Sequence, residues 1–167
     1  MKYEWSNGWW SKLELFRPDV TDDLIFSDLD NLITRPLDFV FDKLTPDRPL
    51  MIDDLDKKQN RLQSAFMWLP HTKKALVWDP FIESPEKHIK EAGVFGDARI
   101  IRTYYNRENT DVFQKIFPDG SICSFPYHYQ RGLHKNAAIV CFHGKKRKPT
   151  LVKRTDPLVR DHFYRYL

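Results

Sequence analysis

The most constraining feature of this sequence is a short apolar run that ends abruptly in acidic residues. Residues 24–26 (LIF) are followed at once by residues 27–30 (SDLD). An apolar run bounded by polar residues predicts a short buried strand. That strand would deliver Asp28 and Asp30 at its carboxyl end and hold both carboxylates rigidly. A second apolar strand is expected at 137–142. We expect it to lie near the first in one small sheet, because ligands of α/β sheets gather at the carboxyl ends of strands.

The rest of the chain predicts a mixture of strands and helices. Further strands are expected at 50–52, 64–69 and 121–129. Helices are expected at 11–16, 36–42, 72–79, 85–91, 93–105, 110–117 and 156–167, the last with Asp156 as its N-cap. In a chain of 167 residues, this mixture predicts a single α/β domain over 1–167, with a mixed sheet flanked by helices.

Composition sets few limits on function. The net charge of +4 attracts anions such as phosphates without choosing among them. Cys123 and Cys141 belong to no Cys-x-x-Cys pair, so two buried, reduced thiols are expected rather than a zinc site or a disulfide. No apolar run reaches membrane-spanning length, and residues 1–10 (MKYEWSNGWW) do not have the pattern of a signal peptide. We therefore expect a cytoplasmic protein without a membrane span.

Asp28 and Asp30 are separated by a single residue and can converge on one divalent cation. Carboxylates are hard oxygen ligands, which Mn²⁺ and Mg²⁺ prefer. Such a cation can bridge a diphosphate and stabilise it as a leaving group. The alternative is a solvated, Asp-rich turn, because a bare Asp-x-Asp occurs often by chance.

The segment 137–149 (AAIVCFHGKKRKP) carries a second candidate site. The expected strand ends at His143, a possible metal ligand, and Gly144 lets the backbone approach a ligand closely. The cations at 145–148 follow at once, so a lysine there could neutralise a phosphate on a metal held by His143. The alternatives are a solvated basic loop or a nucleic-acid patch.

Together these segments resemble the metal-dependent glycosyltransferases of the GT-A fold, especially those related to glycogenin and bacterial galactosyltransferases. The Asp-x-Asp after a strand is matched by Asp28 and Asp30. The other matches are a Trp-Lys helix at 8–16 (GWWSKLELF), a strand at 60–67 (NRLQSAFM), a helix start at 96–98 (GDA), and a His-Gly and Lys-Pro ending at 142–149. The resemblance runs from Gly8 to Pro149.

The resemblance implies a role for each matched position. Asp28, Asp30 and His143 would hold Mn²⁺ or Mg²⁺, and the donor would be a nucleotide sugar, with a UDP-sugar as the first expectation. Asp97 would lie near the reacting carbon as the catalytic residue, although an N-cap behind Gly96 is an equal alternative. The residues that would bind substrate are Lys12, Asn60, Ser64, Asp97, Gly144 and Lys148.

The sequence also departs from the family pattern. Family members carry a strand-helix-strand unit for the base and ribose before the Trp-Lys helix, whereas only a handful of residues precede that helix here. Ala98 replaces the usual glutamine, and the basic run before Pro149 is longer. We therefore expect the metal- and acceptor-side half of a GT-A-like domain, truncated at its amino terminus. It could be a fragment, a minimal version, a decayed relative, or half of a split enzyme whose companion chain supplies the nucleotide-binding unit.

Two other functions compete with this interpretation. Residues 24–33 (LIFSDLDNLI) also resemble a haloacid-dehalogenase-type phosphatase, with Asp28 as nucleophile and Asp30 as acid/base. Leu32 stands where that family has Thr or Val, and no second acid follows Asp97 closely. The other competitor is a non-enzymatic, basic module that binds nucleic acid through 145–154. The acidic stretches at 19–30 and 53–56 argue against a uniformly basic face, so a nucleic-acid partner is not expected.

Overall fold

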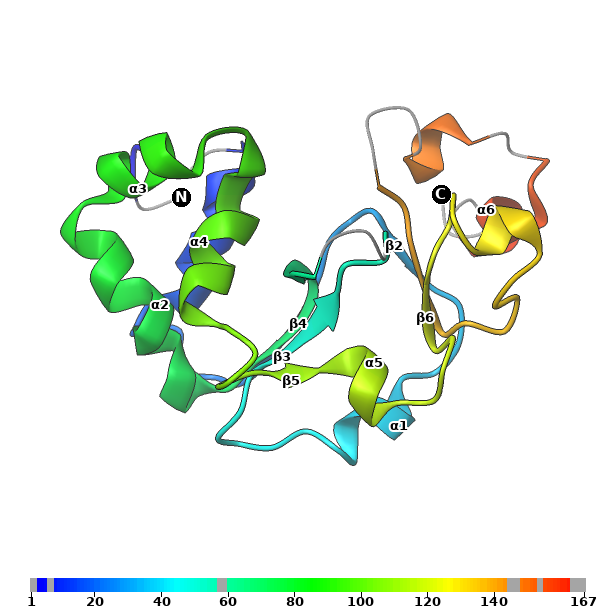
Figure 1. Ribbon diagram of the computed structural model, residues 1–167, viewed down its shortest axis with the longest axis horizontal. Helices are drawn as coiled ribbons and strands as arrows, with labels where there is room; N and C mark the ends of the chain where they lie inside the picture. The colour runs from blue at the N-terminus through cyan, green and yellow to red at the C-terminus, as the bar shows by residue number, and fades with distance from the viewer. Residues whose placement is uncertain (1–2, 6–7, 57–59, 144–147, 153–154, 163–167) are drawn as a thin grey trace.

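The computed structural model describes residues 3–5, 8–56, 60–143, 148–152 and 155–162. Figure 1 shows a group of helices on one side, strands across the centre, and β6 and α6 on the other side. The described strands form two sheets, one of four strands and one of three. The fold is therefore a mixed α/β arrangement with helices beside mixed sheets, as the sequence predicts.

The four-stranded sheet has the order β1-β4-β3-β5. Its central strand β4 (Leu62–Leu69) pairs antiparallel with β1 (Leu24–Ser27) and with β3 (Leu50–Asp53). The short edge strand β5 (Asp111–Val112) pairs parallel with β3. Phe66 and Met67 of β4 are fully buried and belong to two different core clusters. The sheet is therefore covered on both faces, and its packing fixes the end of β1.

The three-stranded sheet has the order β2-β7-β6. Strand β2 (Asn31–Ile33) pairs antiparallel with β7 (Ile139–Cys141), which pairs parallel with β6 (Ile122–Ser124). All residues of β6 and β7 are buried. Because β1 lies in the other sheet, the chain passes from one sheet to the other between Ser27 and Asn31.

The helices fall into two groups. The larger group packs around the first core cluster and consists of η1 (Gly8–Phe16), α2 (His71–Glu83), α3 (Pro85–Ala92), η2 (Gly93–Phe95) and α4 (Gly96–Tyr104). The remaining helical segments are α1 (Asp38–Phe41), α5 (Phe113–Ile116), η3 (Tyr129–Arg131), η4 (Pro149–Leu151) and α6 (Pro157–His162). In η1 the side chains of Leu13 and Phe16 are fully buried, so each contributes about 1.5–3 kcal/mol and fixes which face of η1 meets the core.

Several expected elements differ from those observed. The segment 110–117 was expected to be one helix, but its first part forms β5 and only Phe113–Ile116 is helical. The expected strand 121–129 is limited to β6, and turns follow it. Strand β1 is half-buried rather than buried, because it is an edge strand with one neighbour. The expectation that strands 24–27 and 137–142 share a sheet was wrong, since the neighbour of β7 is β2.

Other local expectations agree with the structure. Asp156 Oδ1 accepts hydrogen bonds from the backbone N–H groups of Leu158 and Val159, so it caps α6 as predicted. Cys123 and Cys141 are both free and buried. In the part of the chain that the structure describes, no helix combines the length and the apolar character that a membrane crossing needs.

Candidate functional site

Asp28 and Asp30 lie in the short turn that joins the two sheets. The backbone N–H of Asp28 donates to the carbonyl oxygen of Ala65 on β4, at 2.8 Å. On the other side, the carbonyl oxygen of Asp30 accepts a hydrogen bond from the backbone N–H of Phe142, also at 2.8 Å. Leu29, between the two acids, is 95% exposed. The turn is thus anchored to one sheet before Leu29 and to the other after it.

Asn31 also fixes this turn, through hydrogen bonds of its side chain and backbone, a role that was not predicted from the sequence. Its side-chain Nδ2 donates to the carbonyl oxygen of Ala65 at 2.7 Å and to Ser27 Oγ at 3.1 Å. Its backbone N–H donates to the carbonyl oxygen of Asp28. The Oδ1 atom of Asn31 is buried and has no hydrogen-bond partner among the described residues. These bonds cross-link both ends of the turn and limit how far the carboxylates can move.

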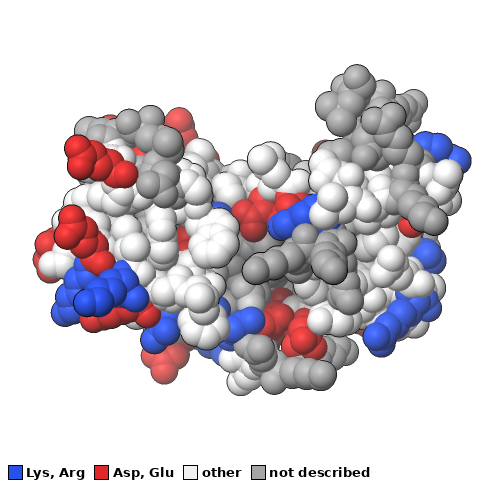
Figure 2. All heavy atoms as spheres, turned by 90° about the horizontal axis from the view of Figure 1, so that it is seen from above, with Lys and Arg blue, Asp and Glu red and all other residues white. Residues whose placement is uncertain are grey.

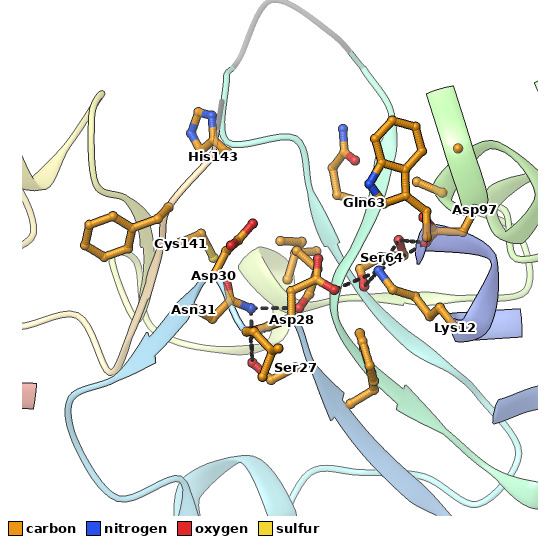
Figure 3. Close-up of a pocket in the computed structure, with 18 of the residues that line it drawn as sticks. Lys12, Ser27, Asp28, Asp30, Asn31, Gln63, Ser64, Asp97, Cys141 and His143 are labelled. Carbon is orange, nitrogen blue, oxygen red and sulfur yellow. Dashed lines mark hydrogen bonds and ion pairs between the residues drawn. The ribbon is translucent and has the colours of Figure 1, made fainter. Parts of the chain in front are cut away.

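A lysine joins two of the predicted site carboxylates (Figure 3). Lys12 Nζ lies 2.8 Å from Asp28 Oδ1 and 3.1 Å from Asp97 Oδ2. It also contacts Ser64 through the backbone oxygen at 3.4 Å and Oγ at 3.3 Å, and Ser64 Oγ donates to Asp97 Oδ2 at 3.2 Å. One ammonium group therefore holds residues of η1, the turn, β4 and α4 together.

Local structure explains why Asp97 points into this network. Helix α4 begins at Gly96, so Asp97 lies inside its first turn rather than at the cap. The N-cap alternative for Asp97 is therefore wrong. Asp97 is 8% exposed, and a buried carboxylate needs a counter-charge and hydrogen bonds. Lys12 and Ser64 provide both.

Burial and charge oppose each other at Asp28. Burial raises the pKa of the Asp28 carboxyl, and the neighbouring Lys12 ammonium lowers it without cancelling the effect of burial. The carboxylate of Asp97 raises the pKa of Asp28 further. Burial lowers the pKa of Lys148, which the charge of Asp28 partly offsets. The site thus holds charged groups with reduced hydration, where a charged ligand is bound more strongly than in open solvent.

The three-stranded sheet supplies the other side of the site. Lys148 forms an ion pair with Asp30 through Nζ and Oδ2. The side chain of His143, which follows β7, has its Nε2 atom 2.7 Å from Ser124 Oγ on β6. Ser124 is fully buried, and its Oγ also accepts the backbone N–H of Tyr127. Ser124 was not recognised from the sequence, because its role depends on the pairing of β6 with β7.

These groups surround one cavity of about 820 Å³. Figure 2 shows a central hollow with acidic side chains in its floor and basic side chains beside them. Seven of the nine predicted site residues line this cavity, namely Lys12, Asp28, Asp30, Ser64, Asp97, His143 and Lys148. Gly144 lies outside the described residues. Asn60 is exposed, precedes β4 and is not among the residues that line the cavity, whereas Arg61 and Gln63 are.

The donor atoms at this site suit a hard divalent cation only in part. Asp28 and Asp30 supply carboxylate oxygens, which Mg²⁺ and Mn²⁺ prefer. Within the described part of the chain, however, no three His, Cys, Asp or Glu side chains are grouped so that they could hold a metal ion. Mg²⁺ commonly binds through one or two carboxylates and substrate phosphates. With only these two carboxylates as ligands, a cation would need phosphate oxygens to complete its coordination.

Gly96 brings the backbone of α4 close to Trp9 at the cavity rim. Its φ of +60° favours glycine, and a Cβ atom there would lie 2.9 Å from Trp9 Cε3. Gly93 has a similar φ of +53° but has no neighbouring atom within 4 Å of such a Cβ in the described structure.

We expect Gly96→Ala and Gly93→Ala each to lower the free energy of unfolding by about 1–3 kcal/mol, because both place a Cβ in a strained backbone conformation. Only Gly96→Ala should also displace the Trp9 indole and change the tryptophan fluorescence of the folded chain. Denaturant titration and emission spectra measure the two effects. Identical spectra for both variants would mean that the Trp9 ring is not held against Gly96.

The fold is similar to that of solved glycosyltransferases. The crystal structure of the glycosyltransferase GlyE from Streptococcus pneumoniae TIGR4 matches with a TM-score of 0.64 and 16% sequence identity, over 89% of this chain and 42% of GlyE. Its apo form matches with a TM-score of 0.62 and 14% identity, over 93% and 43%. The apo structure of the bifunctional glycosyltransferase WbbM gives a TM-score of 0.62 and 12% identity, over 98% of this chain and 37% of WbbM.

At these identities the likeness establishes a glycosyltransferase-like fold. The chain spans about two fifths of the length of these solved structures. No protein-family model and no curated protein matches the sequence. The structural matches therefore confirm the fold that was expected from the Asp-x-Asp and Trp-Lys motifs.

Proposed function

We propose that this chain transfers a sugar from a nucleotide-sugar donor, with a divalent cation bound at Asp28 and Asp30. The observation that carries the proposal is the convergence of the Asp-x-Asp turn, Lys12, Asp97 and Lys148 on one cavity in a glycosyltransferase-like fold. These residues come from distant parts of the chain. A solvated Asp-rich turn would not require such a partner set.

Asp28 and Asp30 would hold Mn²⁺ or Mg²⁺, and His143 is the candidate for a further ligand. When bound, the cation would stabilise the negative charge of the diphosphate leaving group. Lys148 lies at the same turn through its ion pair with Asp30. Its ammonium group would exchange the Asp30 carboxylate for a phosphate oxygen when the donor binds, and would neutralise charge that develops on the diphosphate.

Lys12, Ser64 and Asp97 would form the sugar side of the site. The Asp97 carboxylate would lie near the reacting carbon and stabilise the positive charge that develops there. Lys12 would keep Asp97 and Asp28 at a fixed separation through its two ion pairs. Ser64 would orient Asp97 through its hydroxyl hydrogen bond. Such pre-organisation supplies a large part of the rate in group transfer.

The two competing functions receive less support. The phosphatase interpretation lacks the Thr or Val that this family has at the position of Leu32. The basic segment 145–154 that could bind nucleic acid lies in part outside the described residues, and the floor of the central hollow carries acidic side chains (Figure 2). The solved structures with a similar fold are glycosyltransferases.

The donor is best identified by direct assay. The chain is incubated with Mn²⁺ and a panel of UDP- and GDP-sugars, and the released nucleoside diphosphate is measured. We expect UDP-sugars to give the highest release. Release that is independent of added cation and unchanged in Asp30→Asn would contradict the proposed role of the Asp-x-Asp turn.

Replacing Asp30 with asparagine should weaken Mn²⁺ binding roughly 10- to 100-fold when UDP is present. Without UDP, Mn²⁺ should bind weakly to the wild-type chain, because phosphate oxygens complete its coordination. Isothermal titration calorimetry measures both affinities. Asp38→Asn is the matched control, since Asp38 is exposed in the first turn of α1. Equal weakening by the two substitutions would identify the Asp-x-Asp as an ordinary surface turn.

A further inference from the structure

A group of arginines lies beside the cavity, away from the Asp30–Lys148 pair. Arg99 and Arg102 are one turn apart on α4, so they lie on the same face of that helix. Both guanidinium groups contact the ring of Phe95, with the Cζ atoms 5.6 and 5.9 Å from the ring centroid. Phe95 is half-exposed and lines the cavity. The aromatic ring therefore holds two cations at the cavity rim.

Arg61 adds a third cation to this group. It precedes β4 and lines the same cavity as Phe95. Its Nε atom donates to Asp54 Oδ2 at 2.7 Å, and Gln63 donates to the same oxygen at 2.9 Å. Asp54 is thus shared between two donors, and it is the carboxylate that acts on Arg102 within the described structure.

The charges of this group are not balanced. Burial lowers the pKa of Arg102, and the positive charges of Arg61 and Arg99 lower it further, whereas Asp54 opposes them. Arg102 is therefore partly desolvated and lies within the electrostatic reach of Arg61, Arg99 and Asp54, whereas Arg99 is exposed. Arginine presents planar pairs of N–H donors that match a phosphate or a carboxylate. A bound anion would relieve the repulsion and satisfy the donors of Arg99 and Arg102.

We infer that Arg61, Arg99 and Arg102, with Phe95, form a subsite for a phosphate or carboxylate group carried by the acceptor. Arg99 and Arg102 lie on the same helix as Asp97, which belongs to the proposed sugar side. The donor diphosphate has its proposed partners elsewhere, at the turn that carries Asp30 and at Lys148 before η4. The assignment to the acceptor rests on the proposed function, whereas the binding of an anion by the arginines does not.

The test uses the full chain with neither donor nor cation, and glucose 6-phosphate, glucuronate and neutral glucose as probes. Binding is followed by calorimetry and by NMR of the probes. Glucose 6-phosphate, glucuronate or both should bind, and glucose should bind at least about tenfold more weakly. The double variant Arg99→Gln/Arg102→Gln should lose about tenfold or more in affinity for the anionic probe. The control is Arg160→Gln, because Arg160 is exposed on α6 and pairs with Asp161; it should bind as the wild type does.

Two further measurements separate the possible failures. The double variant should melt at the same temperature as the wild type or higher at low salt, because removing like charges relieves repulsion.

Binding of UDP with Mn²⁺ should be unchanged in the double variant, and a matching loss there would assign the arginines to the donor and overturn the acceptor subsite. Equal binding of glucose 6-phosphate and glucose, or equal affinity in wild type and variant, would overturn the anion subsite. Anion binding without any sugar transfer would count against the proposed function alone.

Discussion

Replacing Lys12 with methionine is expected to lower the free energy of unfolding at pH 7 by about 2–3 kcal/mol. The side chain of Lys12 is 12% exposed, and that of Asp97 is 11% exposed. Methionine keeps most of the volume but leaves two carboxylates facing each other without a counter-charge. Because the side chain of Asp28 is more exposed, at 33%, the loss of stability should be smaller than for a fully buried ion pair. Urea titration measures it, with Lys87→Met on α3 as an exposed control expected to change stability by no more than about 0.5 kcal/mol.

The effect of Lys12→Met should depend on pH with a defined sign. In the wild type the pKa of Asp28 is already raised above its ordinary value of 3.8 by burial, and Lys12 opposes that rise. Without Lys12 the pKa of Asp28 rises further. A carboxyl group whose folded-state pKa exceeds its unfolded-state value binds its proton more tightly when folded, so it adds stability as the pH falls through the folded pKa. The deficit of the variant should therefore shrink between pH 7 and about pH 4. A deficit of the same size at both pH values would show that lost packing, rather than charge, destabilises it.

Asp97→Asn is expected to reduce the release of nucleoside diphosphate roughly 100- to 1,000-fold. Asparagine keeps the shape and can still accept the Ser64 hydrogen bond, but it removes the negative charge proposed to face the reacting carbon. The assay uses the donor and cation that give the highest release from the wild type. Donor affinity, measured separately, should change far less than the rate, because the charge acts mainly in the transition state.

The control for Asp97→Asn is Asp111→Asn. Asp111 is also ion-paired, through Arg48 at 2.8 Å, but it lies on β5 and is not among the residues that line the cavity. The Asp111→Asn substitution should leave the rate of nucleoside diphosphate release unchanged. A comparable fall in both variants would mean that general loss of ion pairs, and not the position of Asp97, limits the reaction.

The sequence predicted the acidic turn better than its surroundings. The apolar run before Asp28 is a local signal, and β1 begins with that run at Leu24 and ends one residue after it, at Ser27. Strands β2 and β5 have three and two residues, too few to show a period. Both depend on partners far away in the chain. For the same reason one sheet was expected, whereas the described strands form two.

The same distinction, between local sequence patterns and contacts between distant segments, applies to the site. Asp28, Asp30 and His143 came from patterns within short segments. Ser124 and the arginines of α4 gain their positions only through contacts between segments, with His143 and with Phe95. For Asn60 the resemblance gave an approximate position in the chain but not the start of β4, and the neighbouring Arg61 and Gln63 are the residues that line the cavity.

The position of the acidic turn between two sheets has a consequence for how the chain folds. Asn31 pairs with Cys141 across about 110 residues of chain, whereas Leu24 pairs with Leu69 across about 45. Closing the longer loop costs more entropy, so the Lys12 half of the site should assemble before the Lys148 and His143 half. In an intermediate that contains only the four-stranded sheet, Asp28 would therefore already be in place. The ion pair between Asp30 and Lys148 would not yet have formed. On this order of events, the cavity would be complete only after β2 has paired with β7.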